Sequence, residues 1–210
     1  MDIQTYIGFI GVNTYVLIDE NNNSIIIDPS ENALSILRNL QKNGFFLKAV
    51  LLTHGHFDHI EGAIELQDYA PIYIYEGEEQ FLNDKSLNLC EELGKIQSGK
   101  IANYKTFSSG DLKIDGFLCN IKVLHTPGHT FGSCSLLIDG KLFSGDTLFY
   151  HSFGRYDFPT GNFNALCKSV VGLLDNLDES VEIYPGHGEK TSVKEEKLYN
   201  GLYHYAKNQL

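Results

Sequence analysis

Residues 53–59 read Thr-His-Gly-His-Phe-Asp-His and place four side chains that can bind a metal within six positions. Three of them are imidazoles and one is a carboxylate. The apolar run at residues 47–53 is rich in Val and Leu and predicts a buried strand directly before them. Residues 60–69 carry apolar side chains at helical spacing and predict a helix. We therefore expect the four side chains at the C-terminal end of a strand, where open α/β sheets place their ligands.

The spacing within this segment decides which side chains can meet. His54 and His56 are two positions apart, so in an extended turn they point the same way and could bind one metal. Asp58 and His59 follow at the start of the helix and could bind a second metal. Neither pair completes a coordination shell, because zinc usually takes four ligands and keeps one position open or water-filled when it is catalytic. Further ligands are therefore expected downstream.

Three later strand ends supply candidates. His129 follows a strand in the motif Pro-Gly-His-Thr, where glycine permits a sharp turn. His125 ends that strand, and we interpret it as a structural histidine or as one that supports a ligand. Asp146 follows the next hairpin in the motif Ser-Gly-Asp-Thr, and His187 ends a strand in Pro-Gly-His. A carboxylate such as Asp146 can bridge two cations.

The candidates divide into two sets with one shared member. We assign His54, His56 and His129 to one metal, Asp58, His59 and His187 to the other, and Asp146 to both. Imidazole and carboxylate ligands suit two divalent ions, with zinc expected and iron or manganese compatible. Side chains behind the ligands should fix the imidazole tautomers. The candidates for that task are Asp28, Thr53 and Thr130.

Composition limits the alternatives. The net charge is −11, which argues against a nucleic-acid partner because such a surface needs a basic footprint. The apolar content of 42% allows a sizeable core, and we expect one domain over residues 1–210. No signal peptide or membrane-spanning run is evident, so no membrane partner and a cytoplasmic location are expected. The four scattered cysteines are then expected to be reduced and not catalytic.

The remaining pattern predicts alternating strands and helices. Turn residues and apolar runs predict strands at residues 6–9, 14–18, 24–27, 71–75, 104–107, 112–114, 117–124, 135–138, 141–143 and 181–185. Helices are predicted after a Ser30 cap, at 163–174, and at 192–210 with a Ser192 cap and apolar contacts from Val193, Leu198, Leu202 and Tyr205. Residues 76–103 are weakly patterned, with helical pieces at 78–82 and 87–93. We interpret this stretch as a mobile cover or substrate-shaping loop.

The four motifs, taken in order, resemble the metallo-β-lactamase fold superfamily. The resemblance implies an α/β fold, an αββα four-layer sandwich of two mixed β-sheets flanked by helices. It also implies that the seven assigned positions bind two metals. His59 at its motif position looks like the hydroxyacylglutathione hydrolase (glyoxalase II) branch.

That branch implies a metal-dependent hydrolase in which a metal-bridging hydroxide attacks a small-molecule thioester. Asp58 and Asp146 would be the catalytic carboxylates. Two departures bear on glutathione: the segment after His187 is too short for the helical domain that helps hold it, and the matching basic and tyrosine residues are largely missing. Arg155 is the candidate residue for binding an anionic substrate. The alternative is that it forms a structural ion pair with Asp157 or another acidic residue.

Other functions stay open. One alternative is a mononuclear iron persulfide dioxygenase, a family that shares these motifs and has a Gly-Arg-Thr-Asp stretch similar to residues 154–157 of this chain, Gly-Arg-Tyr-Asp. Such an enzyme would need only His54, His129 and Asp146 as its metal ligands. A β-lactamase is less favoured by the branch resemblance, and an RNA-processing nuclease by the charge. The non-enzyme alternative is a metal-stabilised binding module, although structural zinc sites are usually closed. The acyl group, the thiol carrier, the metal and the oligomeric state are not determined by the sequence.

Overall fold

The computed structural model describes residues 1–92 and 99–209. Its first sheet has six strands in sequential order, antiparallel from β1 to β3 and parallel from β3 to β6. The strands are β1 (Asp2–Ile7), β2 (Asn13–Ile18), β3 (Asn23–Ile27), β4 (Phe46–Leu51), β5 (Ile72–Tyr75) and β6 (Tyr104–Phe107). Strands β2 and β3 are buried along almost their whole length, as expected for strands covered on both faces.

The second sheet also has six strands, in the order β14-β13-β10-β9-β8-β7. Its strands are β7 (Gly110–Leu112), β8 (Ile121–His125), β9 (Cys134–Ile138), β10 (Lys141–Gly145), β13 (Glu182–Pro185) and β14 (Thr191–Ser192). Only β10 and β13 are parallel; the other pairs are antiparallel. A small separate ribbon pairs β11 (Leu148–Phe149) with β12 (Ser152–Phe153).

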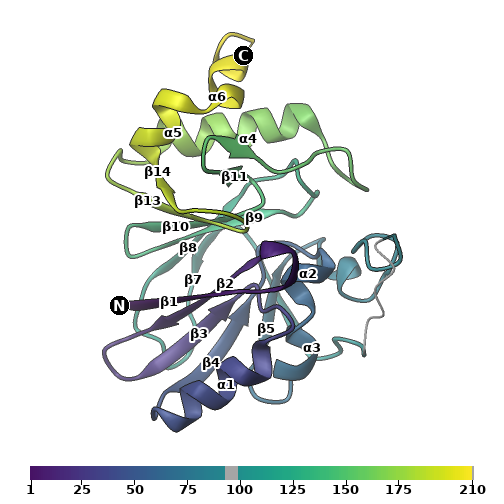
Figure 1. Ribbon diagram of the computed structural model, residues 1–210, viewed down its shortest axis with the longest axis vertical. Coiled ribbons are helices and arrows are strands. Elements are labelled where there is room, and N and C mark those ends of the chain that lie inside the picture. Colours follow the sequence, from purple (N-terminus) through teal and green to yellow (C-terminus); the bar gives the residue numbers. More distant parts are fainter. Residues whose placement is uncertain (93–98, 210) are drawn as a thin grey trace.

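Helices cover the outer faces of the two sheets (Figure 1). On the first sheet lie α1 (Ala33–Lys42), α2 (Phe57–Ile60) and α3 (Ala63–Leu66); on the second lie α4 (Phe163–Asn176), α5 (Val193–Tyr199) and α6 (Gly201–Lys207). Among the described residues there are also two 3-10 turns, η1 (Phe9–Gly11) and η2 (Glu79–Leu82). The expected αββα sandwich is confirmed. No helix in the described residues is long and apolar enough to cross a membrane.

Three apolar clusters follow from this layering. Residues such as Leu17, Ile25 and Phe143 fill the space between the sheets, while Val16 and Ile26 point the other way, toward α1. Neighbouring residues of one strand therefore serve different layers, because side chains alternate along a strand. A third cluster joins the outer face of the second sheet to α4, α5 and α6.

Several predicted boundaries are wrong, each for a local reason. The first strand runs from Asp2 to Ile7, because residues 9–11 form a 3-10 turn with Ile10 in the left-handed region. The helix expected at 60–69 is two short helices. Between them Gly62 donates its amide to the carbonyl of Pro29, 2.9 Å away, instead of continuing the helical ladder. Ser30 does not cap α1, whose N-cap is Asn32.

The C-terminal helix is also interrupted. Ser192 caps α5 as expected, but Asn200 is extended and its side chain caps a new helix, α6, by accepting from Leu202 and Tyr203. Of the expected apolar contacts, Val193 and Leu202 are buried, whereas Leu198 and Tyr205 are exposed.

The chain changes sheet after Phe107, and the strand predicted at 112–114 runs from Gly110 to Leu112. Strand β6 lies parallel to β5 in the first sheet, while β7 belongs to the second, so residues 108–109 cross from one sheet to the other. A short helical piece is present at Glu79–Leu82, but residues 87–92 are not helical and the end of that expected piece lies outside the described residues. The covering role of residues 76–103 stays a prediction.

Candidate metal centre

Strand ends from both sheets meet at one edge of the sandwich and carry the seven predicted side chains. Strand β4 leads through residues 52–56 into α2, and together they supply His54, His56, Asp58 and His59. Loops after β8, β10 and β13 supply His129, Asp146 and His187. The structure thus brings together residues that are far apart in the chain.

Three buried imidazoles form the first group. The Nε2 atoms of His54 and His129 are 3.2 Å apart, and Nδ1 of His56 is 2.9 Å from Nε2 of His129. Each of the three side chains is at most 3% exposed. Their ring nitrogens therefore converge on one point, which is the arrangement that metal ligands require.

Asp58, His59 and His187 form the second group. Oδ2 of Asp58 lies 3.3 Å from Nε2 of His187 and 3.6 Å from Nε2 of His59. The two imidazole Nε2 atoms are 3.4 Å apart. His187 is the most exposed of the three, so this group lies nearer to solvent than the first.

Asp146 lies between the two groups, and its two oxygens face different histidines. Oδ1 is 3.4 Å from Nε2 of His59, whereas Oδ2 is 3.5 Å from Nε2 of His129. A carboxylate in this position can contribute one oxygen to each of two neighbouring cations.

Hydrogen bonds behind the cluster set the tautomers of two imidazoles. Nδ1 of His59 donates to Oδ2 of Asp28 at 3.0 Å, and Nδ1 of His129 donates to the carbonyl of Arg155 at 2.7 Å. Both partners can only accept, so the proton must be on Nδ1. The Nε2 atoms are then directed at the cluster, which is the arrangement found around metal-bound histidines.

Thr53 sets the tautomer of His54. Its hydroxyl donates to Oδ2 of Asp28 at 2.6 Å and lies 3.2 Å from Nδ1 of His54. Since the hydroxyl proton is used on Asp28, Nδ1 of His54 must donate to the threonine oxygen. This leaves Nε2 of His54 without a proton. It lies 3.2 Å from Nε2 of His129, which is also unprotonated.

Burial and charge act in opposite directions across the cluster. Burial, reinforced by the neighbouring imidazoles, lowers the pKa of His54 and His56 well below the usual value, so both are neutral donors of a lone pair. Burial also disfavours a charge on His59, but Asp58, Asp146 and Asp28 outweigh it and raise its pKa to about 10. The carboxylates therefore draw positive charge to the space between the two groups.

The donor set fits metal ions on two observations. Two lone pairs, on His54 and His129, face each other with no proton between them, an arrangement that only a cation or an additional donor can stabilise. Oδ1 of Asp146 is buried and has no hydrogen-bond partner among the described residues. A buried carboxylate oxygen without a hydrogen bond is costly, and a bound cation removes that cost.

Glycines let the loops approach the cluster closely. Gly128 has a φ of +138°, and a side chain there would collide with the backbone of Leu166 in α4. A Cβ on Gly186 would strike Oδ1 of Asp146 and lie 2.9 Å from the ring of His59. The Pro-Gly-His motifs therefore serve the packing of the site as well as its turns.

Glu78 was not identified from the sequence. Its carboxylate is fully buried and accepts from the amide of Gly55 at 3.1 Å and from the amide of Gly132 at 2.8 Å. It thereby ties the loop of His54 and His56 to the loop that follows His129. Burial raises its pKa, which the hydrogen bonds from Thr130 and the two amides oppose. A lone glutamate after a parallel strand was the available signal.

Two other expectations concern residues near the cluster. His125 stacks on Tyr75 and bonds the carbonyl of Phe131, outside the cluster. The hydroxyl of Thr130 bonds Ser133 and Glu78 and forms no hydrogen bond with an imidazole of the described residues, so its expected role in fixing a tautomer is wrong.

Arg155 forms the ion pair that was the alternative to substrate binding. Its guanidinium donates two hydrogen bonds to Asp157, at 2.9 and 2.7 Å, and stacks on Phe158 with 4.0 Å between the charge centre and the ring. Phe158 in turn packs edge-on against His56. The side chain of Arg155 is well exposed, and a contact with substrate stays a prediction.

The comparisons with known proteins agree with this geometry. A family model described as the metallo-beta-lactamase superfamily matches residues 7–187. The chain is 35% identical over 199 residues to the probable metallo-hydrolase YqgX of Bacillus subtilis, covering 92% of this chain and 93% of the relative. It is 33% identical over 194 residues to the hydroxyacylglutathione hydrolase GloC of Haemophilus influenzae, covering 90% and 91%.

Solved structures show the same fold. The BLEG-1 B3 metallo-beta-lactamase has a TM-score of 0.86 and 32% identity, with 95% of this chain and 98% of the other covered. TTHA1623 in a di-iron-bound form has a TM-score of 0.83 and 28% identity, with 96% of this chain and 99% of the other covered. ETHE1 from Myxococcus xanthus has a TM-score of 0.77 and 26% identity, with 100% of this chain and 91% of the other covered. This chain belongs to the metallo-beta-lactamase superfamily, and its His/Asp cluster is a site for divalent metal ions.

Proposed function

We propose that this protein is a dinuclear metal-dependent hydrolase that cleaves a small-molecule thioester, in the manner of a hydroxyacylglutathione hydrolase. The observation that carries the proposal is the position of Asp146, with one oxygen toward His59 and the other toward His129. The 33% identity with a protein named hydroxyacylglutathione hydrolase supports the choice of a thioester.

The cluster residues would hold two cations, with Asp146 between them. Two divalent ions, expected to be zinc, would supply a water of lowered pKa and Lewis-acid stabilisation of a developing oxyanion. Asp58 is held ionised, because His59 and His187 outweigh the effect of its burial and lower its pKa. It can therefore accept a hydrogen bond from the attacking water and orient it toward the thioester carbonyl. Phe81 and Phe158 pack against His56 and help to exclude bulk water from it, and Phe149 packs against the more exposed His187.

A thioester panel tests this proposal. Protein of measured metal content is assayed with S-lactoylglutathione and several coenzyme A esters, beside the oxygen ester of the same acyl group. We expect turnover of at least one thioester that scales with bound metal. Absence of thioester turnover by fully loaded protein would contradict it.

Two other activities have specific observations behind them. The Arg155–Asp157 pair lies in the stretch that resembles persulfide dioxygenases. Oxygen consumption with a persulfide and one iron per chain would favour that enzyme. The neighbour at 32% identity is titled a B3 metallo-beta-lactamase, and nitrocefin turnover tests that activity. The second group around Asp58 favours the dinuclear hydrolase over the mononuclear dioxygenase.

The partner expectations belong to the same proposal. We propose a small-molecule substrate with no nucleic-acid and no membrane partner. A chain of net charge −11 repels polyanions, which supports the first exclusion.

A further inference from the structure

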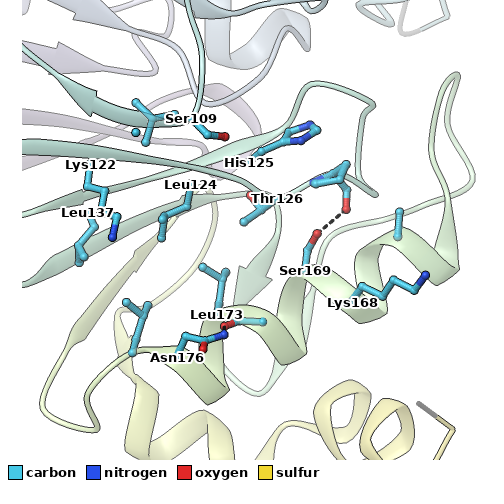
Figure 2. A pocket seen from close by; sticks show the side chains of 16 residues that line it. Ser109, Lys122, Leu124, His125, Thr126, Leu137, Lys168, Ser169, Leu173 and Asn176 are labelled. Carbon is cyan, nitrogen blue, oxygen red and sulfur yellow. Dashed lines mark hydrogen bonds between the residues drawn. The ribbon is translucent and has the colours of Figure 1, made fainter.

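A second concave site lies on the outer face of the second sheet, away from the metal cluster. It is a groove of about 630 Å³ between α4 and strands β8 and β9 (Figure 2). None of the seven cluster residues lines it. Its volume falls in the range of small-molecule sites, roughly 300 to 1,000 Å³.

The interior of the groove is aliphatic. Leu124 and Leu137 point from the sheet toward α4, where Leu173 lies (Figure 2). Leu177, directly after the helix, also lines the groove. The sixteen lining residues include no Phe, Tyr or Trp. A ligand with a flexible hydrocarbon chain therefore suits this surface better than one with an aromatic ring.

Gly172 keeps the groove open. It lies in the interior of α4, a 14-residue helix, where glycine is less favourable than alanine. Its position does not reflect close packing, because a Cβ built there would meet nothing within 4 Å. The missing side chain leaves room between the helix and the sheet.

The charged groups in the groove are all basic. Lys122 and Lys168 line it, and the lining includes no Asp or Glu although the whole chain carries a net charge of −11. Neither lysine forms an ion pair with another described residue within 4 Å. Asp111 is the cross-strand neighbour of Lys122 on β7 but does not line the groove. The two lysines lie at opposite ends of the groove in Figure 2.

We propose that this groove binds a fatty-acid anion, independently of the reaction at the metal cluster. The hydrocarbon chain lies along the leucines, and a lysine ammonium binds the carboxylate. Charge complementarity and an aliphatic interior together select this class: a short carboxylate lacks the apolar contact, and a neutral amphiphile lacks the ion pair.

Titration calorimetry with three probes tests the selection. Decanoate below its micellar concentration is compared with acetate, which has the charge alone, and decanol, which has the chain alone. We expect saturable binding of decanoate at one site per chain. Acetate and decanol should each bind at least about tenfold more weakly than decanoate. Equal binding of decanol, or no binding of decanoate, overturns the proposal.

A matched pair of glycine variants locates the site. Gly172→Leu fills the groove, whereas Gly201→Leu adds the same side chain to an exposed helical position that also has nothing within 4 Å. We expect Gly172→Leu to weaken decanoate binding by about tenfold or more, because the leucine occupies the chain's place, and Gly201→Leu to leave it unchanged. Circular dichroism checks that both variants are folded. If a folded Gly172→Leu protein binds decanoate as tightly as the unchanged protein does, the assignment of the site to this groove is contradicted.

Lysine variants test the charge without changing the packing of the groove. Lys122→Gln combined with Lys168→Gln should weaken decanoate binding several-fold, while Lys42→Gln combined with Lys85→Gln, which changes the net charge equally elsewhere, should not. If both pairs behave alike, the lysines do not bind the carboxylate.

The groove could instead be covered by a second copy of the chain. Sedimentation distinguishes this case: a dimer that Gly172→Leu dissociates, with no decanoate binding by the monomer, makes the groove an interface and overturns the proposal.

Discussion

Oδ2 of Asp28 lies 3.0 Å from Nδ1 of His59 and 2.6 Å from the hydroxyl of Thr53. The other oxygen accepts from the amide of Thr53 at 2.8 Å. Asp28 itself sits in the left-handed region at a φ of +50°, a conformation that aspartate adopts at some energetic cost. One carboxylate at the end of β3 therefore orients His59 directly and His54 through Thr53.

Replacing this carboxylate with an amide should weaken metal binding. In Asp28→Asn, one side-chain atom becomes a donor and faces the donors of His59 or Thr53. Loss of such supporting partners typically lowers metal affinity by about 10- to 100-fold. Competition with a chromophoric chelator measures it, and Asp111→Asn, an exposed aspartate outside the site, is the control. An unchanged affinity in Asp28→Asn would show that the imidazoles need no such support.

Asp146→Asn tests the bridging role. The amide has one oxygen that can coordinate instead of two, so we expect loss of one of the two metals and of most turnover. Elemental analysis and the thioester assay on the same preparation measure both. A variant that still holds two ions per chain with full activity would refute the bridge.

Glu78→Gln should destabilise the site from behind. The amide keeps one acceptor, so one of the amides of Gly55 and Gly132 loses its partner in a buried place, at a cost of about 1 to 3 kcal/mol. Urea unfolding of protein treated with a chelator measures the loss in the free energy of unfolding. Glu76→Gln, an exposed glutamate two residues earlier, should show almost none. Equal stability of the two variants would mean that the buried carboxylate does not hold the loops together.

Removing the metals should lower thermal stability. Ions that bind only the folded chain stabilise it by about 2.7 kcal/mol per site at a free concentration one hundred times the Kd. The melting temperature should fall on treatment with a chelator and recover on adding zinc. Asp146→Asn should show a smaller fall, because it holds fewer ions. A melting temperature insensitive to chelator would contradict the metal assignment.

Gly172→Ala should stabilise the protein even though it narrows the groove. Alanine favours the helix interior over glycine by about 1 kcal/mol, and nothing within 4 Å obstructs its Cβ. Urea unfolding measures the gain, with Ser169→Ala as a contrasting change that removes the hydrogen bond to the carbonyl of Pro127. A destabilised Gly172→Ala would show that α4 needs the glycine for its own structure.

Much of the fold could be predicted because its signals are local. Apolar runs bounded by turn residues located most strands of the two sheets, although β14 was not predicted, and the Asp139-Gly140 turn joins β9 to β10. The errors have two causes. Gly62 interrupts a helix by bonding Pro29, a distant residue that no local pattern reports. Asn200 interrupts another helix by capping the next one, a local signal that the prediction of a single helix overlooked.

The sequence by itself determined the seven candidate ligands and the family, because the spacing of His, Asp and Gly around strand ends restricts which chemistry can follow. Only the tertiary structure decided how they are held. Glu78 joins two loops, and Asp28 directs two imidazoles. These contacts depend on which strands become neighbours in the two sheets, and pairing between distant segments is a property of the whole packed chain.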